Sequence, residues 1–196
     1  MSKHTYLSAG LLLAASSVFA QGPSFDCSKV EQGSIAERVC QSAELSALDR
    51  QLAEVYAAAN QQAGNRQPPV LKAEQRGWIK GRDDCWKAAD IPACIKDSYQ
   101  LRIAELQARY RLVESIGPVF FSCNGNPADE VVVTFFKTTP PSLIAERGDS
   151  SSLMYQSISA SGAKYEGQNN LFWEHQGEAT IRWGFQAAEM HCRKSP

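Results

Sequence analysis

Residues 159–179 read SASGAKYEGQNNLFWEHQGEA, and two cysteines, Cys123 and Cys192, lie on either side of this stretch. Its first part is a run of small residues around Gly162, and its second part begins with an aromatic pair. Glycine accepts the positive φ of a tight reversal, and aromatic residues favour strands. The stretch therefore predicts a loop followed by an aromatic strand, inside a small β-module that a disulfide closes.

The rest of the chain after Gly117-Pro118 supports this interpretation. Short apolar segments alternate with clusters of Gly, Pro, Asn and Asp, which are typical turn residues. We expect strands at residues 119–123, 131–136, 143–145, 153–157, 164–166, 171–173, 179–183 and 189–192. Short strands at this spacing predict an antiparallel sandwich or small barrel.

The preceding segment, from Ser34 to about Ile116, has a helical period instead. Ser34 and Glu37 form a capping-box pattern, in which the serine accepts from the backbone and the glutamate reaches back. Apolar stripes follow at spacings of three and four residues. They predict a first long helix through residues 45–56, a second at about 70–85, and a third from near Pro92 through Val113.

The first 20 residues resemble a secretory signal peptide. A weakly basic start precedes a short apolar stretch, and Val18-Phe19-Ala20 fits the small-x-small cleavage pattern. We expect cleavage after Ala20, with a helical domain at 21–116 and a β-domain at 117–196. The apolar stretch is too short for a membrane span, and no cysteine directly follows the cleavage site, so we expect no membrane anchor.

Charge and cysteine content narrow the range of possible functions. The formal net charge is −1, and neither half has the basic excess that nucleic-acid binding needs. Six cysteines in an exported chain indicate disulfides rather than metal ligands, so we expect no metal and no cofactor. We expect the local pairs Cys27–Cys40, Cys85–Cys94 and Cys123–Cys192, while the residues leave crossed pairings among the four N-terminal cysteines open.

No catalytic residue is expected. Ser161 could act as a nucleophile only with His175 or His191 as its base, and it does not lie in a Gly-x-Ser-x-Gly elbow. Asp83-Asp84 could form a carboxylate pair, but we favour a solvated helix end next to a disulfide. A weak hydrolase is therefore a third hypothesis, behind two binding functions.

The loop itself admits two interpretations. Its small residues could let the backbone enter a narrow groove, with the Ser161 hydroxyl as donor and acceptor at the tip. An ordinary hairpin turn would have the same composition. Tyr165, with a polar tip on an aromatic ring, suits either an interface or a strand start, and we expect Phe172 and Trp173 to pack inside the barrel.

Residues 119–194 resemble the MliC-type inhibitors of c-type lysozyme. The resemblance includes the bracketing cysteines, the Ser-Gly-Ala-Lys-Tyr sequence at 161–165, and Phe172-Trp173 with the Gly-Glu-Ala sequence at 177–179. It implies a small antiparallel β-barrel whose first motif enters the lysozyme cleft. By this resemblance Ser161, Gly162, Lys164, Tyr165 and His175 would contact lysozyme, with Ser161 bonded to a catalytic carboxyl group.

One position departs from the family pattern. The family has roughly Phe-Trp-Thr-Lys-Gly-Asp-Glu-Ala, whereas this chain has His175 at the lysine position and its glycine one place later. An imidazole ordinarily changes charge near pH 6.5. We expect His175 to replace the lysine ammonium, with Lys164 as the other candidate cation and a surface histidine without a role as the alternative.

Residues 25–112 resemble the LprI/DUF1311-type domain. The resemblance rests on Leu48-Asp49, on the Tyr-Ala-Ala sequence at 56–58, and on the segment from Trp78 through Arg82 to Cys85. The family name implies lysozyme inhibition, and no residue roles come with it. We expect Trp78 in the core and Arg82 paired with a carboxylate of a helix.

The sequence thus predicts an α+β protein in two domains, with an N-terminal all-α disulfide-tied helical domain and a C-terminal small antiparallel β-barrel. The expected function is inhibition of c-type lysozyme in the periplasm or outside the cell, through loop 159–165. The alternative is an envelope binding module for peptidoglycan or an assembly partner, without inhibitory activity. Peptidoglycan binding in the absence of lysozyme would separate the two.

Overall fold

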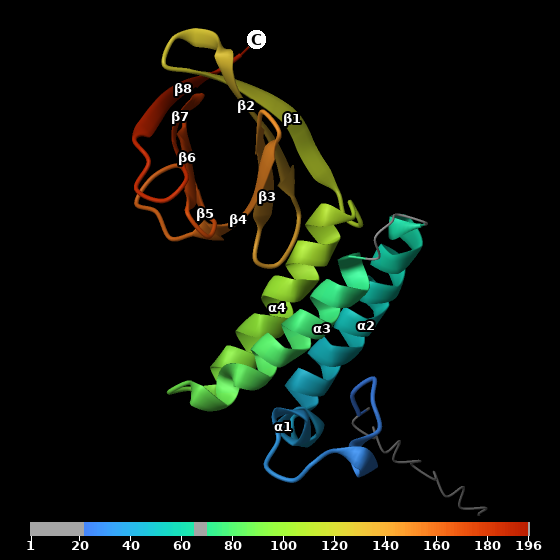
Figure 1. The fold of residues 1–196 in the computed structure, drawn as a ribbon. Coiled ribbons are helices and arrows are strands. Elements are labelled where there is room, and N and C mark those ends of the chain that lie inside the picture. Colours follow the sequence, from blue (N-terminus) through green and yellow to red (C-terminus); the bar gives the residue numbers. More distant parts are fainter. Residues whose placement is uncertain (1–21, 65–69, 196) are drawn as a thin grey trace, which may run out of the picture.

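The computed structural model describes residues 22–64 and 70–195, and it divides them into helices followed by strands (Figure 1). The helices are α1 (Ile35–Gln41), α2 (Ala43–Ala63), α3 (Val70–Asp83) and α4 (Ile91–Arg109), with short 3₁₀ turns at Cys27–Lys29 and Asp84–Lys87. The strands are β1 (Ser115–Cys123), β2 (Asn126–Phe136), β3 (Ser142–Arg147), β4 (Ser150–Ser157), β5 (Ala163–Glu166), β6 (Asn170–His175), β7 (Glu178–Trp183) and β8 (Glu189–Lys194). The predicted α+β class in two domains is confirmed. The expected cleavage site at Ala20 lies outside the described residues.

Side-chain caps explain where the helices begin. The Ser34 hydroxyl accepts from the Glu37 N–H at 3.1 Å, as the capping box predicts, but the Glu37 carboxylate accepts from Gly33 rather than from Ser34 itself, at 2.7 Å. Ser42 caps α2 and Asp90 caps α4 in the same way. Each cap satisfies a backbone donor that a helix start leaves without a partner.

The helical domain has its core between α2 and α4, which run alongside each other (Figure 1). Tyr99, Ile95 and Leu106 of α4 are fully buried there. Among the described helices, none has both the length and the apolar character that a membrane crossing requires.

The prediction that helical structure continues to about Ile116 was wrong. Helix α4 ends at Arg109, and Arg111 takes a positive φ of 53°, which the helix cannot continue. The chain is already in β1 at Ser115, where Ser115 and Ile116 pair with Phe136 and Phe135 of β2. Tertiary pairing therefore overrides the helical apolar spacing of this segment.

All eight strands form a closed antiparallel barrel in chain order, with β8 pairing back onto β1. Inward-facing side chains fill its interior, notably Phe121, Phe172, Met154 and Ile181. Phe121 meets Phe172 edge-on, with ring centroids 5.3 Å apart. Closure leaves no free strand edge in the barrel.

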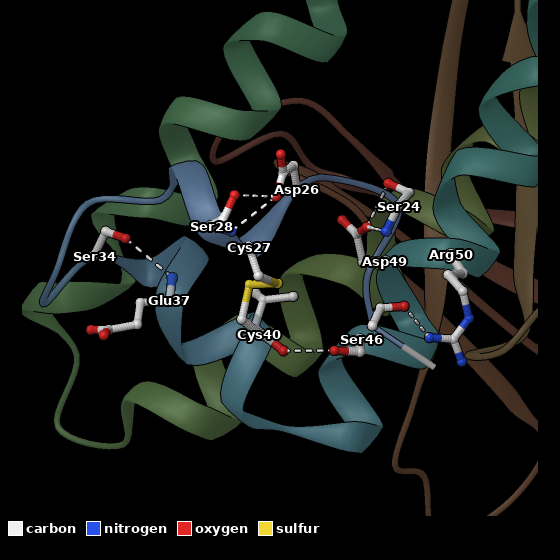
Figure 2. The surroundings of a disulfide bond; sticks show 12 residues. Ser24, Asp26, Cys27, Ser28, Ser34, Glu37, Cys40, Ser46, Asp49 and Arg50 are labelled. Atoms are coloured by element: carbon white, nitrogen blue, oxygen red, sulfur yellow. Dashed lines mark hydrogen bonds between the residues drawn. A yellow bond between two sulfur atoms is a disulfide. The ribbon is translucent and has the colours of Figure 1, made fainter. Parts of the chain in front are cut away.

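The three disulfides join the pairs that we expected. Cys27–Cys40 ties the N-terminal segment to α1, Cys85–Cys94 closes the connection between α3 and α4, and Cys123–Cys192 joins β1 to β8. Figure 2 shows the first of these, with Ser24 of the N-terminal segment bonded to Asp49 of α2 beside it. Small domains with modest cores gain from such cross-links.

The barrel also touches the helical domain. The Tyr155 hydroxyl of β4 donates to the Leu101 carbonyl of α4 at 3.1 Å, and α4 packs beside β3. Lys137 forms an ion pair with Glu114 in the connection between α4 and β1. These contacts place the barrel directly against the last helix.

Candidate functional site

The loop between β4 and β5 forms the tip of the candidate site. Ser161 is exposed, and Ile158, three residues earlier, is 99% exposed. The Ser159 hydroxyl donates to the Ser161 carbonyl at 2.6 Å and accepts from the Ser161 N–H at 3.3 Å. Ser159 therefore holds the backbone of the tip, while the Ser161 side chain stays at the surface.

Gly162 lets this tip lie close against the neighbouring strand. Its φ is +68°, as the predicted reversal requires. A Cβ at this position would lie 2.2 Å from the Glu174 carbonyl oxygen of β6, which is far inside van der Waals contact. Only glycine fits both the conformation and the space.

Trp173 braces the loop from the outside of the barrel. Its indole N–H donates to the Ser161 carbonyl at 2.9 Å, and the side chain is 40% exposed. We expected Trp173 inside the barrel with Phe172, and the structure corrects this. Phe172 points inward and is fully buried, so the next residue of the strand must point outward.

A surface groove of about 650 Å³ extends from the tip across the outer faces of β6, β7 and β8. Ser161 and Trp173 border it on one side, and Gly125 of the β1–β2 turn borders it elsewhere. The side chains of its floor come mainly from outward-facing strand positions: His175, Glu178, Thr180, His191 and Arg193.

The groove carries both acidic and basic side chains. His175 is exposed at the end of β6, directly opposite Glu178 in the strand register. Glu178 forms an ion pair with Arg193, with 3.2 Å between a carboxylate oxygen and a guanidinium nitrogen, and both side chains are mostly exposed. Exposed pairs of this type hold each other weakly, so Arg193 and Glu178 can both turn to a partner.

Lys164 does not reach the groove. Its ammonium forms an ion pair with Glu166 at 2.7 Å, two residues along the same strand. The hydrogen bond from Lys164 lowers the pKa of the Glu166 carboxyl group. Lys164 thus already has a carboxylate partner on its own strand.

Tyr165 lies in the barrel core. Its side chain is 8% exposed, its ring centroid is 5.7 Å from that of Phe135, and burial raises the pKa of its hydroxyl. Of the five predicted site residues, Ser161 and His175 line the groove and Gly162 adjoins it. Lys164 and Tyr165 do not line it.

Most groove residues were not among the predicted site residues, and Trp173 and His191 are the two with aromatic rings. Trp173 and His175 occupy outward positions of β6, and His191 occupies an outward position of β8 on the other side of β7, so all three face the groove. The period-two alternation of β6 was a usable signal for Trp173. Within residues 22–64 and 70–195, no group of three or more His, Cys, Asp or Glu residues could hold a metal ion.

The chain is similar to known proteins over both halves. A family model described as membrane-bound lysozyme-inhibitor of c-type lysozyme, MliC, matches residues 121–190, and one described as lysozyme inhibitor LprI matches residues 27–106. The arrangement predicted from the sequence is therefore confirmed. The MliC match lies within the barrel, and the LprI match lies within the helical segment.

The similar curated proteins span both halves. Proteins named lipoprotein LprI, from Mycobacterium tuberculosis and Mycobacterium bovis, are 27% identical over 174 residues, which is 89% of this chain and 85% of the relatives. A solved structure of Pseudomonas aeruginosa MliC in complex with hen egg white lysozyme covers 42% of this chain and 86% of that chain, at 22% identity and a TM-score of 0.34.

Proposed function

Because the chain carries an LprI-type helical domain followed by an MliC-type barrel, we propose that it binds and inhibits a c-type lysozyme. The observation that supports this most is the exposed Ser161 on a tip whose backbone is held by Ser159 and Trp173. Such a tip needs little further ordering to enter a cleft, and ordering is a main cost of binding.

The chemistry of lysozyme suits this donor. The enzyme cleaves glycans with a protonated carboxylic acid and an ionised carboxylate on either side of the scissile bond. A serine hydroxyl can donate to the carboxylate and accept from the acid. In our proposal Ser161 lies between these groups, where it excludes the sugar and occupies the groups that carry out hydrolysis.

We propose His175 as the cationic partner of the second carboxyl group. It lines the same groove as Ser161, whereas Lys164 is bonded to Glu166 and would have to leave that carboxylate first. A carboxylate near an imidazole favours its charged form. The departure from the family lysine would then make inhibition depend on pH.

Ile158 and Trp173 would supply apolar contact on either side of the tip. Both are exposed in the free protein, Ile158 almost completely. Burying an aliphatic side chain contributes roughly 1.5–3 kcal/mol. Exposed apolar residues next to a polar tip are what a protein interface uses for affinity.

The proposed location is the periplasm or the cell exterior, through the signal peptide expected at residues 1–20. Three disulfides suit an oxidising compartment of this kind.

The test uses the mature chain and hen egg white lysozyme on two substrates. We expect dose-dependent slowing both of cell-wall lysis and of cleavage of a soluble chromogenic chito-oligosaccharide present in large excess over the inhibitor. The soluble substrate matters because a protein that merely coats cell walls would slow lysis only. Slowing on walls alone would favour the envelope-binding alternative, and no slowing on either substrate would contradict inhibition.

A further inference from the structure

The residues that carry the resemblance of the helical half surround one cleft. Asp49, Tyr56, Trp78 and Arg82 come from different parts of α2 and α3, yet all line a cavity of about 380 Å³ between α1, α2, α3 and the N-terminal segment. We call this the helical cleft; its lining is completed mainly by Phe25 and Gln75. The proposed inhibition of lysozyme by the barrel does not use the helical cleft.

The floor of the helical cleft is a buried hydrogen-bonded chain. Arg82 donates to the Tyr99 hydroxyl at 2.8 Å, and Tyr99 donates to the Asp49 carboxylate at 2.8 Å. Ser24 bonds the other Asp49 oxygen through its N–H and its hydroxyl, which Figure 2 shows. Burial raises the pKa of Tyr99, so its hydroxyl stays neutral and can both accept and donate.

Arg82 retains donors for a ligand. Its Nε and one Nη bond the Asp83 carboxylate, and its other Nη bonds Tyr99. A guanidinium has five N–H groups in a fixed fork, and no hydrogen bond among the described residues uses the remaining two. Because Arg82 is 7% exposed and lines the cleft, those two donors have access to little else.

Aromatic rings form the apolar part of the helical cleft. The Arg82 guanidinium lies 5.5 Å from the Trp78 ring centroid and 5.6 Å from that of Tyr99. The rings of Phe25, Tyr56 and Trp78 are only partly buried. The small residues Ala36 and Ala53 leave the space between them open.

The charges indicate what the helical cleft can hold. Asp49 and Asp83 both bond the chain that contains Arg82, so two carboxylates accompany one guanidinium. No surplus positive charge remains for a carboxylate or phosphate ligand. Oxygen acceptors on a neutral molecule with an apolar face satisfy both the spare N–H groups and the rings, and a pyranose ring has that structure.

We propose that the helical cleft binds a neutral saccharide, with the sugar ring against Trp78 or Tyr56 and its oxygens accepting from Arg82. The volume lies within the range of small-molecule sites, in which apolar walls and a few fixed polar groups combine. This activity is additional to lysozyme inhibition and does not depend on it, since the barrel tip takes no part.

The experiment titrates the mature full chain with N-acetylglucosamine trimer, in the absence of lysozyme, by calorimetry and tryptophan fluorescence. Wild type should bind the trimer saturably. Ala53→Trp fills the helical cleft from an exposed helix position, and should weaken binding at least tenfold. Ala47→Trp adds the same side chain at an exposed position of α2 that does not line the cleft, and should change affinity less than twofold.

Three outcomes would overturn the proposal: no saturable binding by wild type, equal binding by wild type and Ala53→Trp, or equal weakening by both tryptophan variants. Ala53→Trp should also inhibit lysozyme as wild type does. An unchanged helical circular dichroism spectrum shows that the helical domain of the variant is folded, and unchanged inhibition separates failure of the saccharide proposal from failure of the inhibitor proposal.

Discussion

Gly162 is the residue on which the shape of the candidate site depends most. We expect Gly162→Ala to destabilise the barrel by about 1–3 kcal/mol and to weaken lysozyme inhibition, because its methyl group would collide with the Glu174 carbonyl. Gly148→Ala is the matched control, since Gly148 also has a positive φ but has open space around it. Urea unfolding and inhibition constants give the comparison. Equal effects of the two substitutions would mean that close contact with β6 is unimportant.

His175 makes a second, independent prediction. As pH falls from 8 to 6 an imidazole gains a proton, so attraction to a lysozyme carboxylate should grow and inhibition should strengthen roughly two- to fivefold, as expected for an exposed charge pair. Inhibition by His175→Lys should lack the part of the pH dependence that comes from position 175, because an ammonium stays charged from pH 8 to pH 6. The ratio of the two inhibition constants at each pH cancels the titration of lysozyme itself.

Three other titratable or charged groups lie in the same groove and need a control: His191, Glu178 and Arg193. His191→Gln should keep the pH dependence if His175 is its source. A pH-independent ratio between wild type and His175→Lys would show that His175 has no charged role.

Individual site residues were predictable to different degrees. Ser161 and Gly162 could be identified because a tip of small residues is a local feature of sequence. The sequence could not show whether Lys164 is free, because its pairing with Glu166 depends on the strand conformation that places both side chains on one face. The position of Tyr165 follows from the alternation of β5, but only once the strand register is known.

The β4–β5 loop and strand β6 act together as one structural element. Trp173→Phe keeps an aromatic ring but removes the N–H that bonds the Ser161 carbonyl. We expect faster backbone hydrogen exchange in residues 159–162 and weaker inhibition, with global stability changed by less than about 1.5 kcal/mol. Trp86→Phe, at an exposed tryptophan of the helical domain, should change none of these. Unchanged exchange in the loop of Trp173→Phe would contradict the bracing role.

Elements with local signals were the ones that sequence located well. The cap at Ser34, the first-turn proline Pro92 and the short sequence separations of Cys27–Cys40 and Cys85–Cys94 are local features. The start of β1 was missed because Ser115 and Ile116 are in a strand only through pairing with β2. The chain of hydrogen bonds from Arg82 to Asp49 was beyond prediction, since Tyr99 and Asp49 are 50 residues apart.

Cys123–Cys192 closes the whole barrel, because it joins the first and last strands across 69 residues. Replacing both cysteines with alanine should destabilise the barrel by roughly 4 kcal/mol in the chain-entropy model. The double variant Cys27→Ala/Cys40→Ala removes a bridge across 13 residues, and should cost about 3 kcal/mol in the helical domain. Lysozyme inhibition at a temperature where each variant is still folded should survive. A loss of inhibition in the folded barrel variant would mean that the disulfide also shapes the groove.

The molecule as a whole presents two separate surfaces on a joined pair of domains. The barrel carries the tip and groove, α4 packs against β3, and Tyr155 bonds Leu101 across the junction. The helical cleft lies among α1, α2 and α3 in the other domain. A single chain could therefore engage an enzyme with one domain and a saccharide with the other.

The most direct test of the central claim measures inhibition constants for wild type, Ser161→Ala and Ser161→Asp against hen egg white lysozyme. If the Ser161 hydroxyl bonds a catalytic carboxyl group, alanine should weaken inhibition about tenfold or more, as loss of a bond to a charged group does. Aspartate should weaken it further, because a carboxylate would face the carboxylates of the cleft. Gln168→Glu adds the same charge at an exposed turn of the barrel and should have little effect. Inhibition by Ser161→Asp equal to that of wild type would contradict insertion of this tip into the lysozyme cleft.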